Sequence, residues 1–327
     1  MFKALVLRDE DGKTLSKVEE LNIDDLPKGD VLVEVEYSSL NYKDGLAVTG
    51  TGKIIRDFPM VPGIDFAGKV LESGSNDFKV GDSVVLTGWG VGENHWGGFS
   101  QKARLKSKWL VPMPEGGDAP WAMSIGTAGL TAMLSVMALE GAGVMPDAGV
   151  VVVTGATGGV GSTAVSILNK LGYKVAAVTG SETEHEYLRC LGASEILSRE
   201  EMAEKCRPLE NQRWAGAIDT VGDAILARVL AETNYGGAVA ACGLAAGYKL
   251  PSTVMPFILR GVSLLGIDSV ACPIERRIEA WKRLRTDIPT ETLTQLVREI
   301  SLDEVPEAAA AIIKGQIRGR TLIDVNR

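Results

Sequence analysis

The stretch Val150-Val-Val-Val-Thr-Gly-Ala-Thr-Gly-Gly-Val-Gly-Ser162 decides how the middle of this 327-residue chain folds. Its apolar run predicts a buried strand, and the apolar residues after the glycines recur at helical spacing until Gly172. A second apolar run begins at Lys174 and completes a strand–helix–strand unit. Glycines let a backbone approach a ligand closely, and a helix N-terminus offers free N–H groups to a pyrophosphate. With this strand and helix around it, the glycine-rich turn predicts a dinucleotide-binding site.

The end of the second strand indicates which dinucleotide binds. Units that bind NAD usually carry Asp or Glu there, which accepts hydrogen bonds from the ribose 2′-hydroxyl. This chain reads Val178-Thr-Gly-Ser181 and has no carboxylate at that point. We therefore expect NADPH, with Ser181 donating to the 2′-phosphate and also capping a helix that begins at Glu182. Arg199, beyond a third strand, is the candidate cation; the alternative is a solvated surface arginine.

The pattern differs on the two sides of residue 122. Residues 1 to about 120 are β-rich, with strand alternation in Val31–Tyr37 and a turn feeding a strand in Lys79–Leu86. From about 122, helical segments alternate with short apolar runs, which is typical of a parallel sheet covered by helices. Those runs are Val150–Thr154, Lys174–Val178, Ala217–Thr220, Ala238–Cys242 and Leu264–Ile267. Charged helices are expected at Ile274–Arg285 and Thr290–Glu299, and a closing strand at Arg320–Val325.

Composition excludes several classes of protein. Hydrophobic residues make up 45% of the chain, enough for large cores, and the net charge of −8 argues against nucleic acid as the main partner. The N-terminus reads as a strand rather than a signal peptide. The uncharged stretches Trp121–Leu139 and Ala148–Asn169 contain Gly, Ser and Thr, so we expect buried elements and no membrane span. Four cysteines without a CxxC pair fit reduced thiols in a cytoplasm.

Five stretches are informative together: Ser39-Leu-Asn-Tyr-Lys-Asp-Gly45, Phe58-Pro-Met-Val-Pro-Gly-Ile-Asp-Phe-Ala-Gly68, Gly126-Thr-Ala-Gly-Leu-Thr-Ala132, Val153–Gly161 and Leu264-Leu-Gly-Ile-Asp-Ser269. With them, the chain resembles the medium-chain dehydrogenase/reductase superfamily over its full length, in its quinone-oxidoreductase-like branch and, more narrowly, the acrylyl-CoA reductase family. The resemblance implies an α/β fold in which a GroES-like β-rich catalytic domain (1–121 and 268–327) is interrupted by a Rossmann domain with a doubly wound parallel sheet (122–267).

Zinc is not expected. Zinc-dependent relatives carry Gly-His-Glu where this chain has Gly63-Ile64-Asp65, so Ile64 replaces a ligand. No cysteine cluster lies between Thr87 and Trp109, and the two histidines, His95 and His185, are far apart. A tetrahedral Cys/His site therefore cannot be assembled at the expected places.

The resemblance implies reduction of the alkene of acryloyl-CoA to propionyl-CoA, by hydride transfer from NADPH to the β-carbon. Tyr42 is the expected catalytic hydroxyl, although it could instead only pack against the cofactor. Asp65 is expected to orient Tyr42 or Lys43, and a structural role for it is an equal alternative. The residues expected to bind NADPH are Tyr42, Thr157, Gly158, Gly159, Val160, Thr179, Gly180, Ser181, Arg199, Leu244, Ile258 and Ser269.

Other readings stay open at this point. The chain could be an NADPH-dependent quinone or enone reductase of the same branch, or a cofactor-bound structural or RNA-binding protein. An acyl-CoA substrate also needs cations for its phosphates, and the sequence does not choose among Arg260, Arg276, Arg277 and Arg318. We further expect a homodimer.

Overall fold

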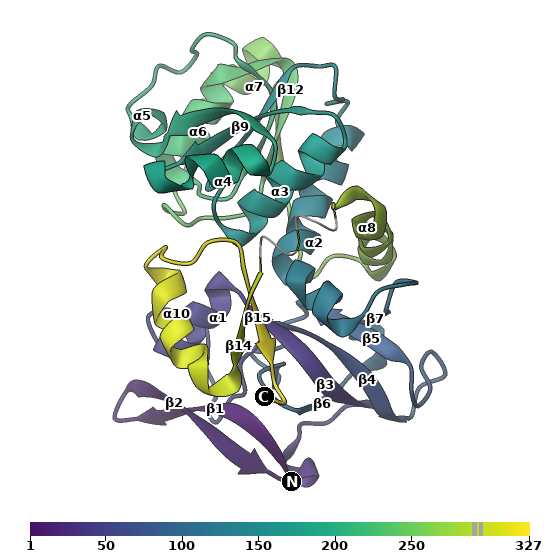
Figure 1. Cartoon of the computed structure of the whole chain (residues 1–327). Helices are drawn as coiled ribbons and strands as arrows, with labels where there is room; N and C mark the ends of the chain where they lie inside the picture. Colours follow the sequence, from purple (N-terminus) through teal and green to yellow (C-terminus); the bar gives the residue numbers. More distant parts are fainter. Residues whose placement is uncertain (290–292, 294–296) are drawn as a thin grey trace. The chain divides into compact units, whose positions relative to one another are not determined.

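The computed structural model describes residues 1–289, 293 and 297–327 (Figure 1). Contacts divide the chain into two units. Unit 1 comprises Met1–Thr127, Ser269–Arg285 and the segment that begins at Leu293, and unit 2 comprises Ala128–Asp268 and a short segment that begins at Thr286. The boundaries predicted from the sequence, at 121/122 and 267/268, lie close to these divisions and stay a prediction.

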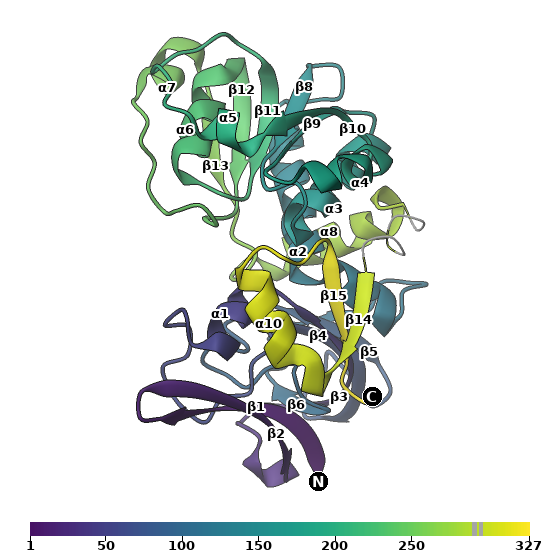
Figure 2. The same ribbon diagram turned by 60° about the vertical axis from the view of Figure 1, so that its left-hand side comes forward.

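Unit 2 is built on a six-stranded parallel sheet in the order β10-β9-β8-β11-β12-β13. Counted along the chain this order is 3-2-1-4-5-6, the doubly wound arrangement of a Rossmann domain, with helices on both faces (Figures 1 and 2). The strands are β8 (Val150–Val153), β9 (Lys174–Thr179), β10 (Ala193–Ser198), β11 (Trp214–Asp219), β12 (Thr233–Ala241) and β13 (Ser263–Gly266). The helices are α3 (Gly159–Lys170), α4 (His185–Cys190), α5 (Arg199–Ala203), α6 (Asp223–Glu232) and α7 (Met255–Arg260).

Unit 1 holds a seven-stranded mixed sheet in the order β14-β15-β3-β4-β5-β7, with β6 also paired to β3, and a separate β1–β2 hairpin. The late strand β15 pairs antiparallel with the early strand β3, so the chain returns to its first domain after unit 2. This confirms the expected fold class. The strands are β1 (Phe2–Glu10), β2 (Lys13–Leu21), β3 (Val31–Leu40), β4 (Asp65–Ser73), β5 (Ser83–Thr87), β6 (Lys102–Leu105), β7 (Leu110–Pro112), β14 (Val297–Ser301) and β15 (Arg320–Asp324).

Two helices of unit 1, α1 (Tyr42–Thr49) and α10 (Val305–Ile313), lie side by side in Figures 1 and 2. Glycine makes this packing possible, because a Cβ on Gly45 would come within 2.6 Å of the Ile312 side chain. A third helix, α8 (Ile274–Asp287), matches the predicted charged helix. The helix predicted at Thr290–Glu299 lies partly outside the described residues, and its last part is wrong, since Val297–Ser301 is strand β14.

Helix α2 (Ala119–Gly141) carries the chain from unit 1 into unit 2. It is long and apolar enough to span a membrane, with a mean hydropathy of 1.6, but 83% of that apolar window is buried inside the structure. The prediction that Trp121–Leu139 is a buried element is therefore confirmed. The helix is interrupted at Gly126, whose φ of 54° and ψ of −157° lie outside the helical region.

Candidate active site

The nucleotide-binding turn of unit 2 has the predicted geometry. The turn leaves β8 at Gly155, whose φ of 58° favours glycine, and the Ala156 N–H donates to Val178 O at 3.1 Å. At Gly161, a Cβ would lie 2.7 Å from the Cα of Ala156, so a larger residue would push the turn away from the helix. Thr157, Gly158, Gly159 and Val160 are partly exposed around the N-terminus of α3. The Gly158 N–H donates to Gly155 O at 3.0 Å, whereas the first N–H groups of α3 are those that a helix leaves without an intrahelical partner and can offer to a pyrophosphate.

The guanidinium of Arg199 lies at the end of β9, where the sequence has no Asp or Glu. Ser198 pairs with Thr179 across β10 and β9, and Arg199 follows directly. A Cβ on Gly180 would lie 2.5 Å from Arg199 Cζ, so the guanidinium packs against the Gly180 backbone. Its pair with Glu200 is 3.4 Å long and exposed on both sides, and such pairs contribute little to stability. The guanidinium is thus available to a phosphate beside Gly180.

Ser181 occupies the N-cap position predicted for it, and the helix begins at Glu182, but the expected capping hydrogen bond is absent. Residues Glu182–Glu184 form a short 3-10 helix before α4, and the Ser181 side chain makes no cap hydrogen bond to it. Its hydroxyl lies 2.9 Å from the Thr183 hydroxyl, and its N–H donates to Thr179 Oγ1 at 3.1 Å. Ser181 is partly exposed and directly follows Gly180, against which Arg199 packs, as a phosphate ligand requires.

The remaining residues expected to bind the cofactor are more scattered. Leu244 follows β12 and is 63% exposed, and Ile258 on α7 is 72% exposed. Ser269 belongs to unit 1, where its carbonyl accepts a hydrogen bond from Arg277 at 3.1 Å. The carboxyl edge of the sheet therefore gathers Thr157–Val160, Thr179–Ser181, Arg199 and Leu244, whereas Ile258 lies on the helix that precedes β13.

Tyr42 is the first residue of α1 and is 44% exposed. The residue before it, Asn41, is the N-cap, and the backbone N–H of Asn41 donates to Asp44 Oδ2 at 2.9 Å. Asp44 Oδ1 also accepts hydrogen bonds from the N–H groups of Gly63 and Ile64, at 3.2 and 3.0 Å. The helix start that presents the Tyr42 hydroxyl is therefore tied to the loop before β4.

Asp65 is fully buried and accepts four hydrogen bonds. Oδ1 accepts from the backbone and side chain of Ser39 at 3.1 and 2.6 Å, and Oδ2 accepts from Asn41 Nδ2 at 2.8 Å and Thr127 N at 2.7 Å. None of these donors belongs to Tyr42, and Lys43 pairs instead with Glu93 at 2.8 Å. The structure therefore places Asp65 as a support for the cap of the Tyr42 helix, which favours the structural alternative over a direct bond to Tyr42 or Lys43.

The guanidinium that accompanies these carboxylates comes from Arg320 on β15, a residue that the sequence analysis did not single out. Arg320 is buried and donates to Ser39 Oγ at 2.6 Å and to Asn41 Oδ1 at 3.2 Å. Burial and the nearby Asp65 raise the pKa of Asp44 to about 7. Burial also lowers the pKa of Arg320, while Asp65 and Asp44 oppose that change. At neutral pH the Asp44 carboxyl is therefore only partly ionised.

Two of the four arginines considered for CoA phosphates are already engaged. Arg277 is fully buried and donates to Thr87 O at 2.8 Å and to the carbonyls of Ser269 and Val270. Arg260 donates to Ala231 O at 2.8 Å and to Glu210 O at 2.5 Å. Arg276 and Arg318 are exposed. Because a phosphate in solution can reach an exposed guanidinium but not the buried one of Arg277, exposure alone favours Arg276 and Arg318.

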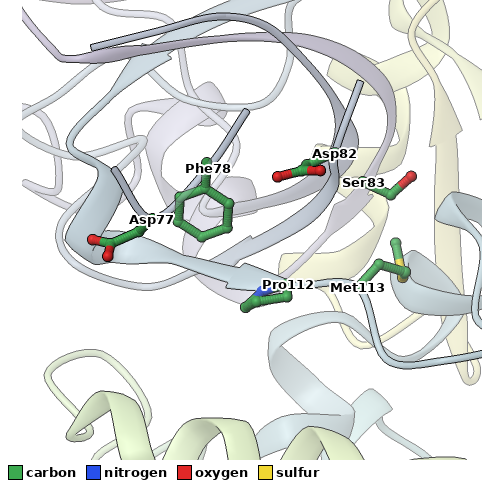
Figure 3. A pocket seen from close by; sticks show the side chains of 6 residues that line it. All are labelled: Asp77, Phe78, Asp82, Ser83, Pro112 and Met113. Carbon is green, nitrogen blue, oxygen red and sulfur yellow. The ribbon is translucent and has the colours of Figure 1, made fainter. Parts of the chain in front are cut away.

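A pocket in unit 1 is unrelated to these residues. It opens where β5 begins, while Asp65 pairs with Thr87 at the other end of the same strand pair. Figure 3 shows the lining side chains Asp77, Phe78, Asp82, Ser83, Pro112 and Met113.

A GroES-like unit joined to a Rossmann unit defines a two-domain, dinucleotide-dependent oxidoreductase. Residues 27–115 match the family model "Alcohol dehydrogenase GroES-like domain", and residues 159–285 match "Zinc-binding dehydrogenase".

Over 99% of its length, the chain is 64% identical to the "Probable acrylyl-CoA reductase AcuI" of Escherichia coli K12, which is covered completely. It is 55% identical to the "Acrylyl-CoA reductase AcuI" of Ruegeria pomeroyi, with both chains fully covered. The crystal structure of E. coli K-12 YhdH with bound NADPH superposes with a TM-score of 0.97 at 64% identity, covering 99% of this chain and 100% of that one. The chain therefore belongs to the medium-chain dehydrogenase/reductase superfamily and, within its quinone-oxidoreductase-like branch, to the acrylyl-CoA reductase family.

The second family description mentions zinc, but the residues of this chain do not fit a zinc ion at that place. Ile64, which replaces the ligand histidine, is buried and apolar, and both oxygens of the adjacent Asp65 accept hydrogen bonds from N–H and O–H donors. Among residues 1–289, 293 and 297–327, no three His, Cys, Asp or Glu side chains are grouped so that they could hold a metal ion.

Proposed function

We propose that this protein reduces acryloyl-CoA to propionyl-CoA with NADPH and without zinc. The observation that carries the proposal is full-length similarity to two acrylyl-CoA reductases, at 64% and 55% identity. The end of β9 supports the choice of cofactor, because it lacks an acid and places Arg199 against Gly180. The proposal includes the predicted cofactor residues, with Thr157–Val160 at the pyrophosphate, Thr179–Ser181 and Arg199 at the 2′-phosphate, and Tyr42, Leu244, Ile258 and Ser269 nearer the nicotinamide.

NADPH supplies a hydride to the β-carbon when bound, and the α-carbon then takes a proton. In our proposal Tyr42 is the catalytic residue, because its side chain is exposed at a helix start that the hydrogen bonds of Asp44 hold in place. It donates a hydrogen bond to the thioester oxygen, on which negative charge develops, or relays the proton. Asp65 and Arg320 act on Tyr42 only through Asn41, so we assign them a positioning role. Arg276 and Arg318 are the exposed cations proposed for the CoA phosphates.

We further propose that unit 1 is the catalytic domain and unit 2 the NADPH-binding domain, with the boundaries predicted from the sequence. The protein is proposed to act as a homodimer in the cytoplasm. Support for the dimer comes from β13, which ends the sheet of unit 2 without a further described strand beside it. The exposed apolar side chains of Val254 and Leu259, which come before β13 in the chain, add to that support.

Steady-state kinetics test the substrate assignment directly. Purified protein with NADPH should give a higher kcat/KM with acryloyl-CoA than with crotonyl-CoA, simple quinones or free enones. If a quinone or free enone is reduced far faster, the protein is a quinone or enone reductase with the same fold and cofactor. The non-enzymatic alternative requires that none of these substrates is reduced.

Replacing Arg199 by alanine is expected to raise the KM for NADPH about tenfold or more. The reason is that a hydrogen bond to a charged group contributes ~1.5–3 kcal/mol. The KM for NADH should change little, since NADH lacks the 2′-phosphate. Arg189→Ala, which removes another exposed arginine of unit 2, is the matched control. Equal effects on both cofactors would remove Arg199 from the phosphate site.

Chelation is expected to leave the rate unchanged. The hydrophobic side chain of Ile64 stands in place of a zinc ligand, and Asp65 is saturated with hydrogen bonds. Metal analysis of the active protein should find no stoichiometric zinc. Activity that disappears with a chelator and returns with added zinc would refute the metal-free mechanism.

A further inference from the structure

One buried carboxylate of unit 2 joins the two loops that flank its strand-order reversal. Asp219 ends β11, which lies directly beside β8, and from these two strands the sheet extends in opposite directions. Its side chain is fully buried. Oδ1 accepts a hydrogen bond from Thr154 Oγ1 at 2.7 Å, and Oδ2 accepts one from Gly222 N at 2.8 Å. Ligands of open α/β sheets bind at this kind of position.

The Thr154 contact fixes the first residues of the nucleotide-binding turn. Thr154 immediately precedes Gly155, and its hydroxyl also accepts the N–H of Thr220 at 3.0 Å. The Thr220 hydroxyl in turn donates to Thr154 O at 2.9 Å. The hydroxyl and the backbone carbonyl of Thr154 are therefore both hydrogen-bonded to residues at the end of β11.

The Gly222 contact fixes the second loop. Gly222 and Asp223 both have positive φ values, 73° and 52°, so this turn needs support from its surroundings. Asp223 N donates to Lys249 O at 3.1 Å, and Ala246 N donates to Val221 O at 2.8 Å. The loop that carries Leu244 is therefore attached to the turn that Asp219 holds.

We propose that Asp219 is a positioning residue for NADPH. One of its oxygens fixes the glycine-rich turn through Thr154, and the other fixes the 243–249 loop through Gly222. This inference rests on the proposed NADPH binding. A carboxylate accepts on both oxygens, whereas an asparagine accepts on one. In Asp219→Asn, the amide oxygen can keep the bond from Gly222 N only if the NH₂ group donates to Thr154 Oγ1. The Thr154 hydroxyl hydrogen then loses its acceptor and both bonds lose their charge, so the two loops are held together more weakly.

Titration of purified protein with NADPH alone, followed by ligand fluorescence, tests this role. We expect Asp219→Asn and Thr154→Val each to raise the Kd about tenfold, and Thr154→Ser, which keeps the hydroxyl, to restore it. The double variant Asp219→Asn/Thr154→Val should have a Kd close to that of whichever single variant binds NADPH less tightly. The reason is that both changes break the same hydrogen-bond network.

The matched control is Glu232→Gln, which alters another buried carboxylate of unit 2. Glu232 accepts from Trp214 Nε1 at 2.9 Å, and Trp214 begins the strand that Asp219 ends. This variant should lower Tm but leave the Kd for NADPH unchanged. If Asp219→Asn and Thr154→Val also bind NADPH as tightly as the wild type, the inference is overturned. A wild-type protein that does not bind NADPH would instead overturn the proposed function.

Discussion

Tyr42→Phe is expected to lower kcat and kcat/KM for acryloyl-CoA together, on the order of a hundred-fold. The change removes one hydroxyl from the exposed start of α1 and leaves the ring in place. Because Tyr42 is 44% exposed, the free energy of unfolding should change by no more than about 0.5 kcal/mol. Steady-state kinetics at saturating NADPH, with Tm measured alongside, separates the two effects.

Tyr235→Phe is the matched control for this measurement. Tyr235 is 77% exposed near the start of β12, at the opposite end of that strand from the loop that carries Leu244. This variant should retain wild-type kinetics. A loss of only a fewfold in Tyr42→Phe would contradict a transition-state role and would leave packing against the cofactor as the better account of Tyr42.

Asp65→Ala is expected to destabilise unit 1 by about 3–5 kcal/mol, because it leaves Arg320 buried without one of its two carboxylates. It also removes the acceptor from four donors on Ser39, Asn41 and Thr127. The conservative Asp65→Asn keeps the shape but presents an NH₂ group to some of these donors, so its cost should be smaller, about 1–3 kcal/mol.

Thermal and urea unfolding, followed by tryptophan fluorescence, measure the decrease in the free energy of unfolding. The control is Asp77→Asn, which changes an exposed acid in the same unit. Wild-type stability in Asp65→Ala, combined with a large loss of kcat, would contradict the structural role and would restore the catalytic role expected from the sequence.

The nucleotide-binding turn could be predicted from the sequence because its determinants are local. The strand, the glycines and the helix of Val150–Lys170 follow one another within one short stretch, and the structure reproduces them. The placement of Arg199 could also be predicted, because β9 and β10 are consecutive parallel neighbours. The N-cap position of Ser181 could be predicted as well, but the helix that follows is a 3-10 turn to which the Ser181 side chain makes no cap hydrogen bond.

The support around Tyr42 could not be predicted in the same way. Its members come from separate elements, and the hydrogen bond between Arg320 and Ser39 joins residues 281 positions apart. Nothing in the local pattern of β15 distinguishes a buried arginine that binds Asn41 from an exposed one. The same holds for Arg277, whose partners are mainly backbone carbonyls that carry no residue-specific signal.

The pairing of β15 with β3 has a consequence for synthesis on the ribosome. At about 5–20 residues per second, the stretch between these strands takes on the order of tens of seconds to translate. During that time β3 can pair with β4 and β6 but lacks β15, and Asp44 and Asp65 lack the guanidinium of Arg320. The Rossmann unit is nearly continuous in the chain and can fold in the meantime, so we expect the nascent protein to carry a finished nucleotide-binding half beside an open, chaperone-dependent one.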